Sequence, residues 1–256
     1  MPSVRLARKA ILMRQWIPSL GLLFLSATAE PATLYRSMFV QAAPGRLLDL
    51  IALYKERLPV YDAAGDERPL MMRHSQGDRW DLMLLFPMGS FTEYYAPERV
   101  QKRRAAAEQS SLPPDEFRKR VYECIAWHEE VFVDGPPLPE VKTAWSAAGY
   151  YHLEIFVALP GKQAELYRER EMENAYSKGI GRPETLIFTH VEGAAWDLFT
   201  MDFYPDLKTY AALNDVPAEK REAAARAAGF PSADAIGPTL RTLISIHHDT
   251  LGGPVR

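Results

Sequence analysis

A strand-like segment followed by a Pro-Gly turn occurs twice in this chain, and its repetition constrains the fold more than any other feature. The first copy is Leu34 to Gly45 (LYRSMFVQAAPG) and the second is Tyr150 to Gly161 (YYHLEIFVALPG). At an offset of 116 residues the correspondence continues without a gap through the next hairpin, where Trp80-Asp81-Leu82 falls on Trp196-Asp197-Leu198. We interpret this self-similarity as a tandem duplication of one structural unit.

Each copy predicts the same order of secondary structure, β-α-β-β-α-β. The opening strand ends at the Pro-Gly breaker, and the next segment carries apolar residues at helical spacing. A hairpin follows around Gly77, then two helical segments and a closing strand at 124–133. We therefore predict an α+β fold of two tandem ferredoxin-like repeats, residues 33–134 and 150–251, joined by a linker at 135–149.

The ferredoxin-like unit has a four-stranded antiparallel sheet with helices on one face, so something must cover the other face. A second copy in the same chain can supply that cover. The pattern resembles the dimeric α/β-barrel superfamily in a tandem-repeat form, and is most similar to its NIPSNAP and antibiotic-biosynthesis-monooxygenase-like branches. The resemblance spans about residues 33 to 251 and rests on the element order and the repeated segments. It implies two sheets that face each other as a pseudo-dimeric barrel, and it supports the fold rather than an activity.

The first 29 residues have the parts of a secretory signal peptide. Four basic residues up to Arg14 precede an apolar run at 16–25, and Ala27-Thr28-Ala29 is a small-residue cleavage site. We predict cleavage after Ala29 and a periplasmic or secreted protein with no stable membrane span, because a spanning helix needs about 20 apolar residues. The alternatives are an uncleaved anchor and an amphipathic leader.

Charge argues against a nucleic-acid partner, and the cysteine count excludes an intrachain disulfide. Without the leader, 26 basic residues stand against 33 acidic ones, a formal net charge of −7. Nucleic-acid binding proteins usually carry a basic face, so we predict no nucleic-acid partner. The single cysteine, Cys124, excludes an intrachain disulfide, and its apolar surroundings predict a buried structural thiol.

Alternation along the strands sorts the polar residues, because successive side chains of a strand point to opposite faces. In the second opening strand, the apolar set Tyr151, Leu153, Ile155 and Val157 is predicted to pack under the helices. The opposite set then faces the space between the two sheets: His152, Glu154 and Phe156. By the same parity we place these residues of the other strands in that space: Arg36 and Met38, His128 and Glu130, His247 and Asp249.

An imidazole and carboxylate cluster is the constellation that could support catalysis. The first and last strands of a ferredoxin-like sheet are neighbours, so His247 and Asp249 are expected close to His152 and Glu154. We predict His247 as a general base that Asp249 or Glu154 orients, since a carboxylate can fix the tautomer of a histidine and raise its basicity. The same atoms could hold a transition metal, although the sequence has no HxxxH or HExxH spacing. A solvated strand end is the third interpretation.

His74 and His190 form a second histidine pair, aligned without a gap by the duplication. If the hairpin turn has three residues, each histidine lies opposite a tryptophan, Trp80 or Trp196, and cross-strand packing explains the pair. The alternative is ligand binding, because the resemblance implies monooxygenases and haem-degrading proteins that use Asn, Trp and His near the cavity. No asparagine accompanies these tryptophans, and Asn174 lies on a predicted helix, so the sequence departs from the haem-degrading pattern.

The function predicted from the sequence is binding of a small, largely apolar organic molecule between the two sheets. As an enzyme the protein would be a cofactor-independent oxygenase or isomerase, and we predict neither a cofactor nor a metal site. The alternatives are a non-catalytic binding or assembly module and a haem- or metal-binding protein. An open cavity beside His247 would favour a ligand site, whereas a lumen filled by side chains would favour the module. Homo-oligomerisation stays open.

Overall fold

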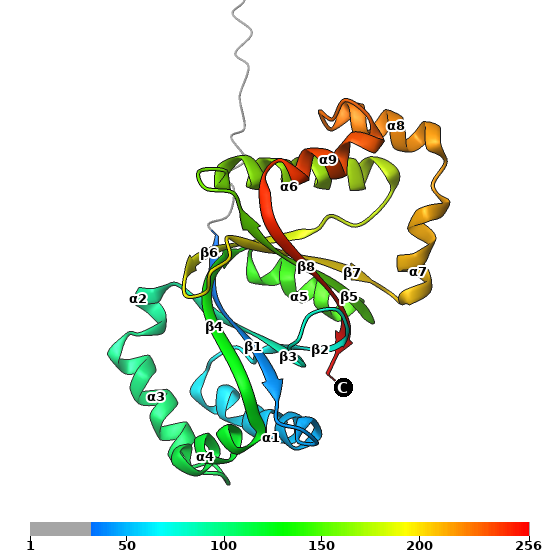
Figure 1. The fold of residues 1–256 in the computed structure, drawn as a ribbon. Helices are drawn as coiled ribbons and strands as arrows, with labels where there is room; N and C mark the ends of the chain where they lie inside the picture. Colours follow the sequence, from blue (N-terminus) through cyan, green and yellow to red (C-terminus); the bar gives the residue numbers. More distant parts are fainter. Residues whose placement is uncertain (1–31, 256) are drawn as a thin grey trace, which may run out of the picture. The chain divides into compact units, whose positions relative to one another are not determined.

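The chain folds around a ring of antiparallel strands, seen in a computed structural model that describes residues 32–255 (Figure 1). The predicted signal peptide lies outside the described residues. Within them, no helix has the length and apolar character needed to cross a membrane. The strands are β1 (Thr33–Ala42), β2 (Leu70–Gln76), β3 (Leu82–Gly89), β4 (Ile125–Gly135), β5 (Tyr150–Ala158), β6 (Leu186–Glu192), β7 (Leu198–Tyr204) and β8 (Ile244–Pro254).

The order of strands around the ring confirms the tandem ferredoxin-like prediction. The ring runs β1-β3-β2-β8-β5-β7-β6-β4, so each repeat contributes four consecutive strands in the ferredoxin-like arrangement. β2 pairs with β8 and β4 pairs with β6, so the two sheets join along both edges into one closed barrel. Closure leaves the described sheet without an unpaired edge strand.

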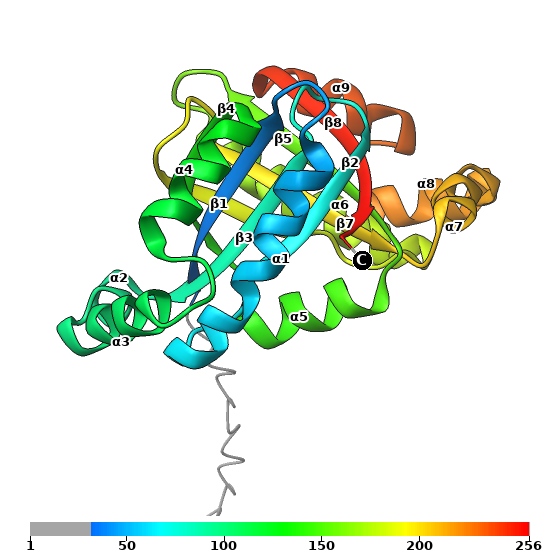
Figure 2. The same ribbon diagram turned by 90° about the horizontal axis from the view of Figure 1, so that it is seen from below.

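The helices of the two repeats lie on opposite outer sides of the ring (Figures 1 and 2). The second helical region of each repeat is divided into several helices, as the predicted separate segments indicated, and the connector contains a helix, α5, that was not predicted. Repeat 1 carries α1 (Leu47–Ala64), α2 (Phe91–Tyr94), α3 (Pro97–Glu108) and α4 (Pro114–Cys124), and the connector carries α5 (Leu138–Ala147). Repeat 2 carries α6 (Gln163–Ile180), α7 (Leu207–Ala211), η1 (Ala212–Asp215), α8 (Ala218–Ala227), η2 (Ala233–Ala235) and α9 (Ile236–Arg241).

Large side chains from both repeats fill the interior of the ring. Phe39 of β1 lies 6.3 Å from Trp196 and 6.2 Å from Phe199, measured between ring centroids. Helix α5 adds Trp145, whose ring is 4.8 Å from that of Tyr151. Each repeat supplies half of this core. The apolar inner face of each sheet is therefore covered by the other sheet, and solvent reaches it only if the barrel opens. Cys124 is buried elsewhere, under the helices of repeat 1, as predicted.

The prediction of which strand face meets the helices was wrong. Tyr151, Leu153 and Ile155 point into the ring and belong to its core. The opposite set is covered by the outer helices, and Phe156 packs against Leu166 of α6 and Leu240 of α9. Parity groups residues correctly but cannot name the face when both faces are buried. The apolar set of β5 lines the ring, where it packs against apolar and aromatic residues of both repeats.

Two hairpin glycines lie where the repeats join. Gly77 of repeat 1 has a φ of +121°, and a Cβ there would lie 2.1 Å from the backbone oxygen of Asp249 in β8. Gly193 has a φ of +128°, and its Cβ would lie 2.7 Å from the backbone oxygen of Glu130 in β4. The duplication therefore places a glycine at both joints, where the closing strand of the other repeat passes too close for a side chain.

Candidate functional site

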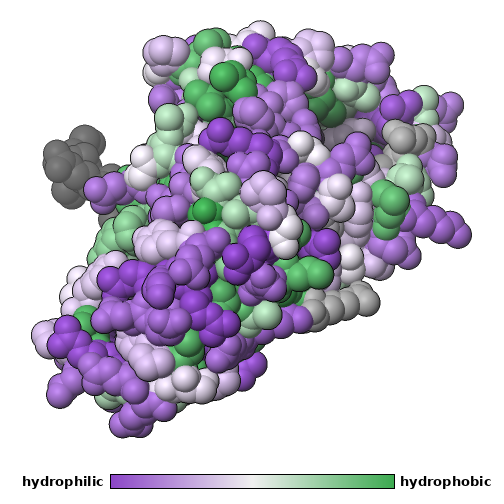
Figure 3. All heavy atoms as spheres, turned by 60° about the horizontal axis from the view of Figure 1, so that its bottom comes forward, coloured by the Kyte–Doolittle hydropathy of each residue, from purple (hydrophilic) through white to green (hydrophobic). Residues whose placement is uncertain are grey.

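A cavity of about 370 Å³ lies between the outer face of the repeat 1 sheet and helices α1 and α4. We call it the repeat 1 pocket. Figure 3 shows this side of the molecule covered largely by hydrophilic side chains, with apolar residues in small separate areas. The pocket is lined by Arg36, Met38, Tyr54, Arg57, Tyr61, Phe86, Pro114, Phe117, Arg118, Val121, Tyr122, Ile125, His128 and Glu130.

Arginine and aromatic side chains pair within this lining. The Arg36 guanidinium carbon lies 4.3 Å from the centre of the Phe86 ring, and its Nη1 lies 3.1 Å from Glu130 Oε2. Arg57 lies over Phe117 at 4.8 Å and donates hydrogen bonds to Ser110 Oγ and the Leu112 carbonyl. Among the described residues, Arg57 has no carboxylate within ion-pair distance. The lining is therefore aromatic, with more arginine than carboxylate charge.

Burial keeps two phenols of this pocket neutral. Tyr54 has its pKa raised by burial, and its hydroxyl donates a hydrogen bond to the Met38 sulfur at 3.7 Å. Burial raises the pKa of Tyr61 to about 12, although the nearby Arg36 charge opposes the shift. At neutral pH Tyr61 can therefore donate a hydrogen bond to a ligand, whereas Tyr54 could do so only in place of its bond to Met38.

The equivalent region of repeat 2 contains charged side chains instead. The offset of 116 residues places His152 at the position of Arg36, and the closing strands match at an offset of 119. Three further replacements introduce a charge, and the fourth keeps a carboxylate: Glu154 for Met38, Arg170 for Tyr54, Asp202 for Phe86, and Asp249 for Glu130. We call His152, Glu154, Asp202, Asp249 and Arg170 the repeat 2 cluster.

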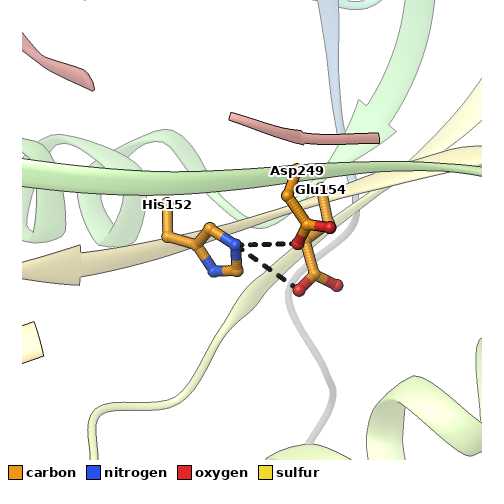
Figure 4. Close-up of side chains that lie close together, drawn as sticks. All are labelled: His152, Glu154 and Asp249. Carbon is orange, nitrogen blue, oxygen red and sulfur yellow. Dashed lines mark hydrogen bonds and ion pairs between the residues drawn. The ribbon is translucent and has the colours of Figure 1, made fainter. Parts of the chain in front are cut away.

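His152 is buried at the centre of the repeat 2 cluster (Figure 4). Its Nδ1 lies 3.1 Å from Asp202 Oδ2, on the neighbouring strand β7. Its Nε2 lies 3.1 Å from Asp249 Oδ1 on β8 and 3.5 Å from Glu154 Oε1 on β5. Thr185 donates a hydrogen bond to the other oxygen of Asp202. Strand pairing sets this geometry, because residue 152 is opposite residue 202 and residue 154 is opposite residue 249.

Arg170 of α6 closes the cluster from the helix side. Its guanidinium lies 2.6 Å from Glu173, pairs with Glu169, and is 3.6 Å from Glu154 Oε2. The same group lies over the ring of Phe156, at 4.9 Å from its centre. This guanidinium is shared among three carboxylates and is closest to the two on its own helix.

The protonation states follow from these contacts. Burial alone would lower the pKa of His152, but the hydrogen bonds to Asp202 and Asp249 outweigh it and raise that pKa to about 10. Burial raises the pKa of Glu154 to about 8, against the pull of the His152 charge. The hydrogen bond from His152 lowers the pKa of Asp249. His152 is thus an imidazolium at neutral pH, and a proton is shared within the cluster.

His247, the predicted general base, lies beside the repeat 2 cluster. Its ring stacks on Phe156 with centroids 6.1 Å apart, and its Nδ1 is 3.3 Å from Asp249 Oδ2. Burial lowers the pKa of His247, so its imidazole is neutral at neutral pH. His247 lines neither the repeat 1 pocket nor a second cavity, of about 340 Å³, at one end of the ring.

The structure divides the predicted site residues between the two repeats. His152, Glu154 and Asp249 meet as expected, with His247 and Phe156 adjoining. Arg36, Met38, His128 and Glu130 line the repeat 1 pocket instead. His74 and His190 pack on Trp80 and Trp196, with centroids 5.8 and 5.9 Å apart, but the backbone pairs each histidine with the next residue, Asp81 or Asp197, and not with the tryptophan. The functional roles given to these residues stay predictions.

Several residues of both regions were missed from the sequence. Asp202 and Arg170 complete the repeat 2 cluster, while Tyr54, Phe86 and Phe117 form walls of the repeat 1 pocket. The offset of 116 already aligns Tyr54 with Arg170 and Phe86 with Asp202. In both aligned pairs an aromatic residue of repeat 1 corresponds to a charged residue of repeat 2. This difference was the sequence signal from which the four residues could have been predicted.

Side chains fill most of the space between the two sheets, and a cavity of about 340 Å³ is left at one end of the ring. Arg79 covers the Trp127 ring there at 4.1 Å, and Trp196 Nε1 donates a hydrogen bond to Glu129. The residues predicted to face that space do not line it. Its walls are Phe39, Asp78, Arg79, Trp80, Trp127, Glu129, Ile155, Val157, Ala195, Trp196 and His248.

Comparison with known proteins supports the fold. No protein-family model and no curated protein matches the chain. Among solved structures, an anthrone oxidase-like protein superposes with a TM-score of 0.54 at 13% identity, covering 89% of this chain and 92% of that one. A candidate monooxygenase of Fusobacterium nucleatum gives 0.52 at 9% identity, covering 89% and 94%. A chlorite dismutase of Candidatus Nitrospira defluvii gives 0.48 at 9% identity, covering 89% and 93%. At these identities the likeness is one of fold, a tandem ferredoxin-like dimeric α/β barrel.

Proposed function

We propose that this protein binds a small, planar, largely apolar organic molecule with one acidic group in the repeat 1 pocket. The observation that carries the proposal is the pocket itself, a cavity of about 370 Å³ bounded by aromatic rings and arginines. Ligand sites in proteins are concave, mostly apolar and equipped with a few placed polar groups. The ring faces of Phe86 and Phe117 would pack against a planar ligand, and Arg57 would pair with its acidic group.

Comparison of equivalent positions in the two repeats supports a binding role for this pocket, as opposed to a gap left by imperfect packing. The same region of repeat 2 is occupied by charged side chains that contact one another. In repeat 1 those positions hold Met38, Tyr54 and Phe86, which leave space between the sheet and the helices. The two repeats share one backbone plan, so the difference lies in the side chains.

A haem is a poor fit for this pocket. His128 is the one imidazole of the lining, and it is exposed, with its ring 6.0 Å from that of Tyr122. The pocket therefore lacks a buried histidine nitrogen as an axial ligand. Of its other candidate ligands, Met38 and Tyr54 are hydrogen-bonded to each other, and burial keeps the Tyr61 phenol protonated. We derive no chemistry through haem.

The finer assignment is a NIPSNAP-like or antibiotic-biosynthesis-monooxygenase-like protein acting as a cofactor-independent oxygenase or isomerase. Two of the superposed proteins are named anthrone oxidase-like and candidate monooxygenase, which agrees with an aromatic ligand. At their low identity to this chain they support its fold and not its activity. If turnover occurs in the repeat 1 pocket, His128 is the imidazole within its lining, and His247 is its counterpart in repeat 2. We also propose export to the periplasm or secretion, on the strength of the leader.

Native mass spectrometry of the full chain from its native compartment tests the proposal. We expect a co-purified organic molecule of a few hundred daltons, and the same spectrum gives the oligomeric state. A bound haem in that preparation would overturn the assignment of the ligand class.

Binding of anilinonaphthalene sulfonate, an anionic aromatic fluorophore, tests the location. Arg57→Gln removes the unpaired cation and Val121→Phe fills the pocket, so each should raise the dissociation constant by about tenfold or more, which is about 1.4 kcal/mol. The matched control is Arg104→Gln, at an exposed position of α3. Equal binding by all three variants and the unaltered chain would place the ligand elsewhere and overturn the proposal.

A further inference from the structure

We propose that His152, Glu154 and Asp249 of the repeat 2 cluster form a binding site for one divalent transition-metal ion. The donors would be His152 Nε2 and one carboxylate oxygen from each of the other two residues. Figure 4 shows the three side chains converging from β5 and β8. The site is separate from the repeat 1 pocket and does not rest on the function proposed there.

The spacing of the donor atoms fits a coordination sphere. All three ligand atoms lie within 4.8 Å of one another. Nε2 is 3.1 Å from the Asp249 oxygen and 3.5 Å from the Glu154 oxygen. Nitrogen and oxygen ligands bind Zn²⁺ at about 2.0 to 2.2 Å, so neighbouring ligands around one ion are about 3 to 3.5 Å apart. The two distances from Nε2 to the carboxylate oxygens therefore already match those around one ion.

The neighbours of His152 orient it as a metal ligand. Asp202 accepts a hydrogen bond from Nδ1, and Thr185 donates to the opposite oxygen of that carboxylate. The Tyr210 ring lies 5.6 Å from the imidazole. A carboxylate on the far nitrogen is the usual outer partner of a metal-bound histidine, because it fixes the tautomer with the other lone pair free. In the metal-free protein Nε2 carries a proton and faces the two carboxylates, so a metal ion would bind there in place of that proton.

The polar groups around Nε2 are incompletely paired in the metal-free protein. Glu154 and Asp249 approach the same nitrogen, and one N–H there cannot satisfy both. Arg170 contacts Glu154 only at 3.6 Å and is closer to Glu173, at 2.6 Å. At the same place in repeat 1, Glu130 is paired with Arg36 at 3.1 Å. Repeat 2 has replaced that arginine by an imidazole and added a carboxylate, and both changes turn an ion pair into a donor set.

An open side completes the site. The Asp249 side chain is 51% exposed, whereas His152 is buried, so solvent reaches the donors from one direction. Three protein ligands with an open position leave room for a water molecule on the ion. Imidazole with two carboxylates suits Zn²⁺, Mn²⁺, Fe²⁺ and Co²⁺.

Equilibrium dialysis of the untagged full chain against Zn²⁺, followed by elemental analysis, tests the proposal. We expect one Zn²⁺ per chain, and Co²⁺ in its place should give visible absorption bands that report the coordination number. Glu154→Gln and Asp249→Asn each remove a ligand oxygen charge while keeping the shape, so each should weaken Zn²⁺ binding by more than tenfold. Asp202→Asn should weaken it by about 10- to 100-fold, as expected for an outer partner.

Glu184→Gln is the matched control, because this exposed acid of repeat 2 pairs with Lys178 outside the cluster. Its Zn²⁺ affinity should equal that of the unaltered chain. Circular dichroism in EDTA establishes that each variant is folded. Less than half an equivalent of Zn²⁺ on the unaltered chain, or equal affinity in Glu154→Gln, Asp249→Asn and Glu184→Gln, would overturn the proposal.

Discussion

Single residues decide how the two repeats differ, although their backbones follow one plan. Met38 and Glu154 occupy equivalent positions on the opening strands, and Phe86 and Asp202 do so on the third strands. The apolar member of each pair borders a cavity, and the charged member belongs to the repeat 2 cluster. Buried charges must be paired or neutralised, so each charge added to repeat 2 required another. The buried imidazole and carboxylate with large pKa shifts, His152 and Glu154, therefore both lie in repeat 2.

Glu154 should make the stability of the metal-free protein depend on pH. Its pKa rises from the ordinary 4.5 to about 8, chiefly because burial disfavours the charged form. A raised pKa means that the folded state holds the proton more tightly. That contribution to stability is full below pH 4.5 and is lost as the pH rises through 8. Glu154→Gln removes the titration while keeping the shape of the side chain.

The measurement is urea unfolding in EDTA at several pH values between 5 and 8. The unfolding free energy of the unaltered chain, relative to that of Glu154→Gln, should fall across this range. His152 contributes a similar loss between pH 6.5 and about 10, but it is present in both proteins and largely cancels in the difference. Parallel curves for the two proteins would show that Glu154 does not titrate in this range.

At the scale of elements, the hairpin glycines fix how the strands of different repeats meet. Gly77→Ala should destabilise the protein strongly, because the added Cβ meets the backbone of Asp249 and Thr250 at 2.1 and 2.7 Å. Gly45→Ala is the matched control, since Gly45 has a φ of +77° but nothing within 4 Å of an added Cβ. Its cost should be about 1 to 2 kcal/mol, the penalty of the left-handed conformation alone.

Chemical denaturation measures both glycine variants. Gly77→Ala should lose clearly more stability than Gly45→Ala, and the amides of β2 and β8 should exchange hydrogen faster, since these strands pair directly at this joint. Equal losses in the two variants would mean that the joint yields to a side chain.

The elements were the most predictable level of this structure. The repeat and its alternation predicted every strand, and the closing strands were predicted to bring residues 152, 154 and 249 together. Face assignment failed at β5, because Tyr151 and Phe156 are both fully buried and only the covering partner differs. Helix α5 was missed because Pro137 and Pro139 suggested a linker, whereas proline is also favoured in the first turn of a helix. Asp202 sits in an otherwise apolar strand, and strand periodicity alone does not show which neighbour it contacts.

At the scale of the whole molecule, the two repeats share one core and should therefore behave as one cooperative unit. Tyr35 of repeat 1 packs edge-on against Phe188 of repeat 2 at 5.5 Å, and Phe39 contacts both Trp196 and Phe199. Strand pairs join the repeats at both edges of the ring. Opening one repeat would expose the aromatic face of the other, so the repeats should unfold together.

Phe39→Ala tests this coupling. Truncating a fully buried phenylalanine costs about 3 to 5 kcal/mol, and Phe39 is 1% exposed and contacts rings from both repeats. The unfolding midpoint in urea should fall, yet tryptophan fluorescence and far-ultraviolet circular dichroism should still report one coincident transition. Phe91→Ala, at a 39% exposed position of α2, should cost clearly less. Two separate transitions, with only the repeat 1 signal shifted by Phe39→Ala, would show instead that each half of the ring is stable by itself.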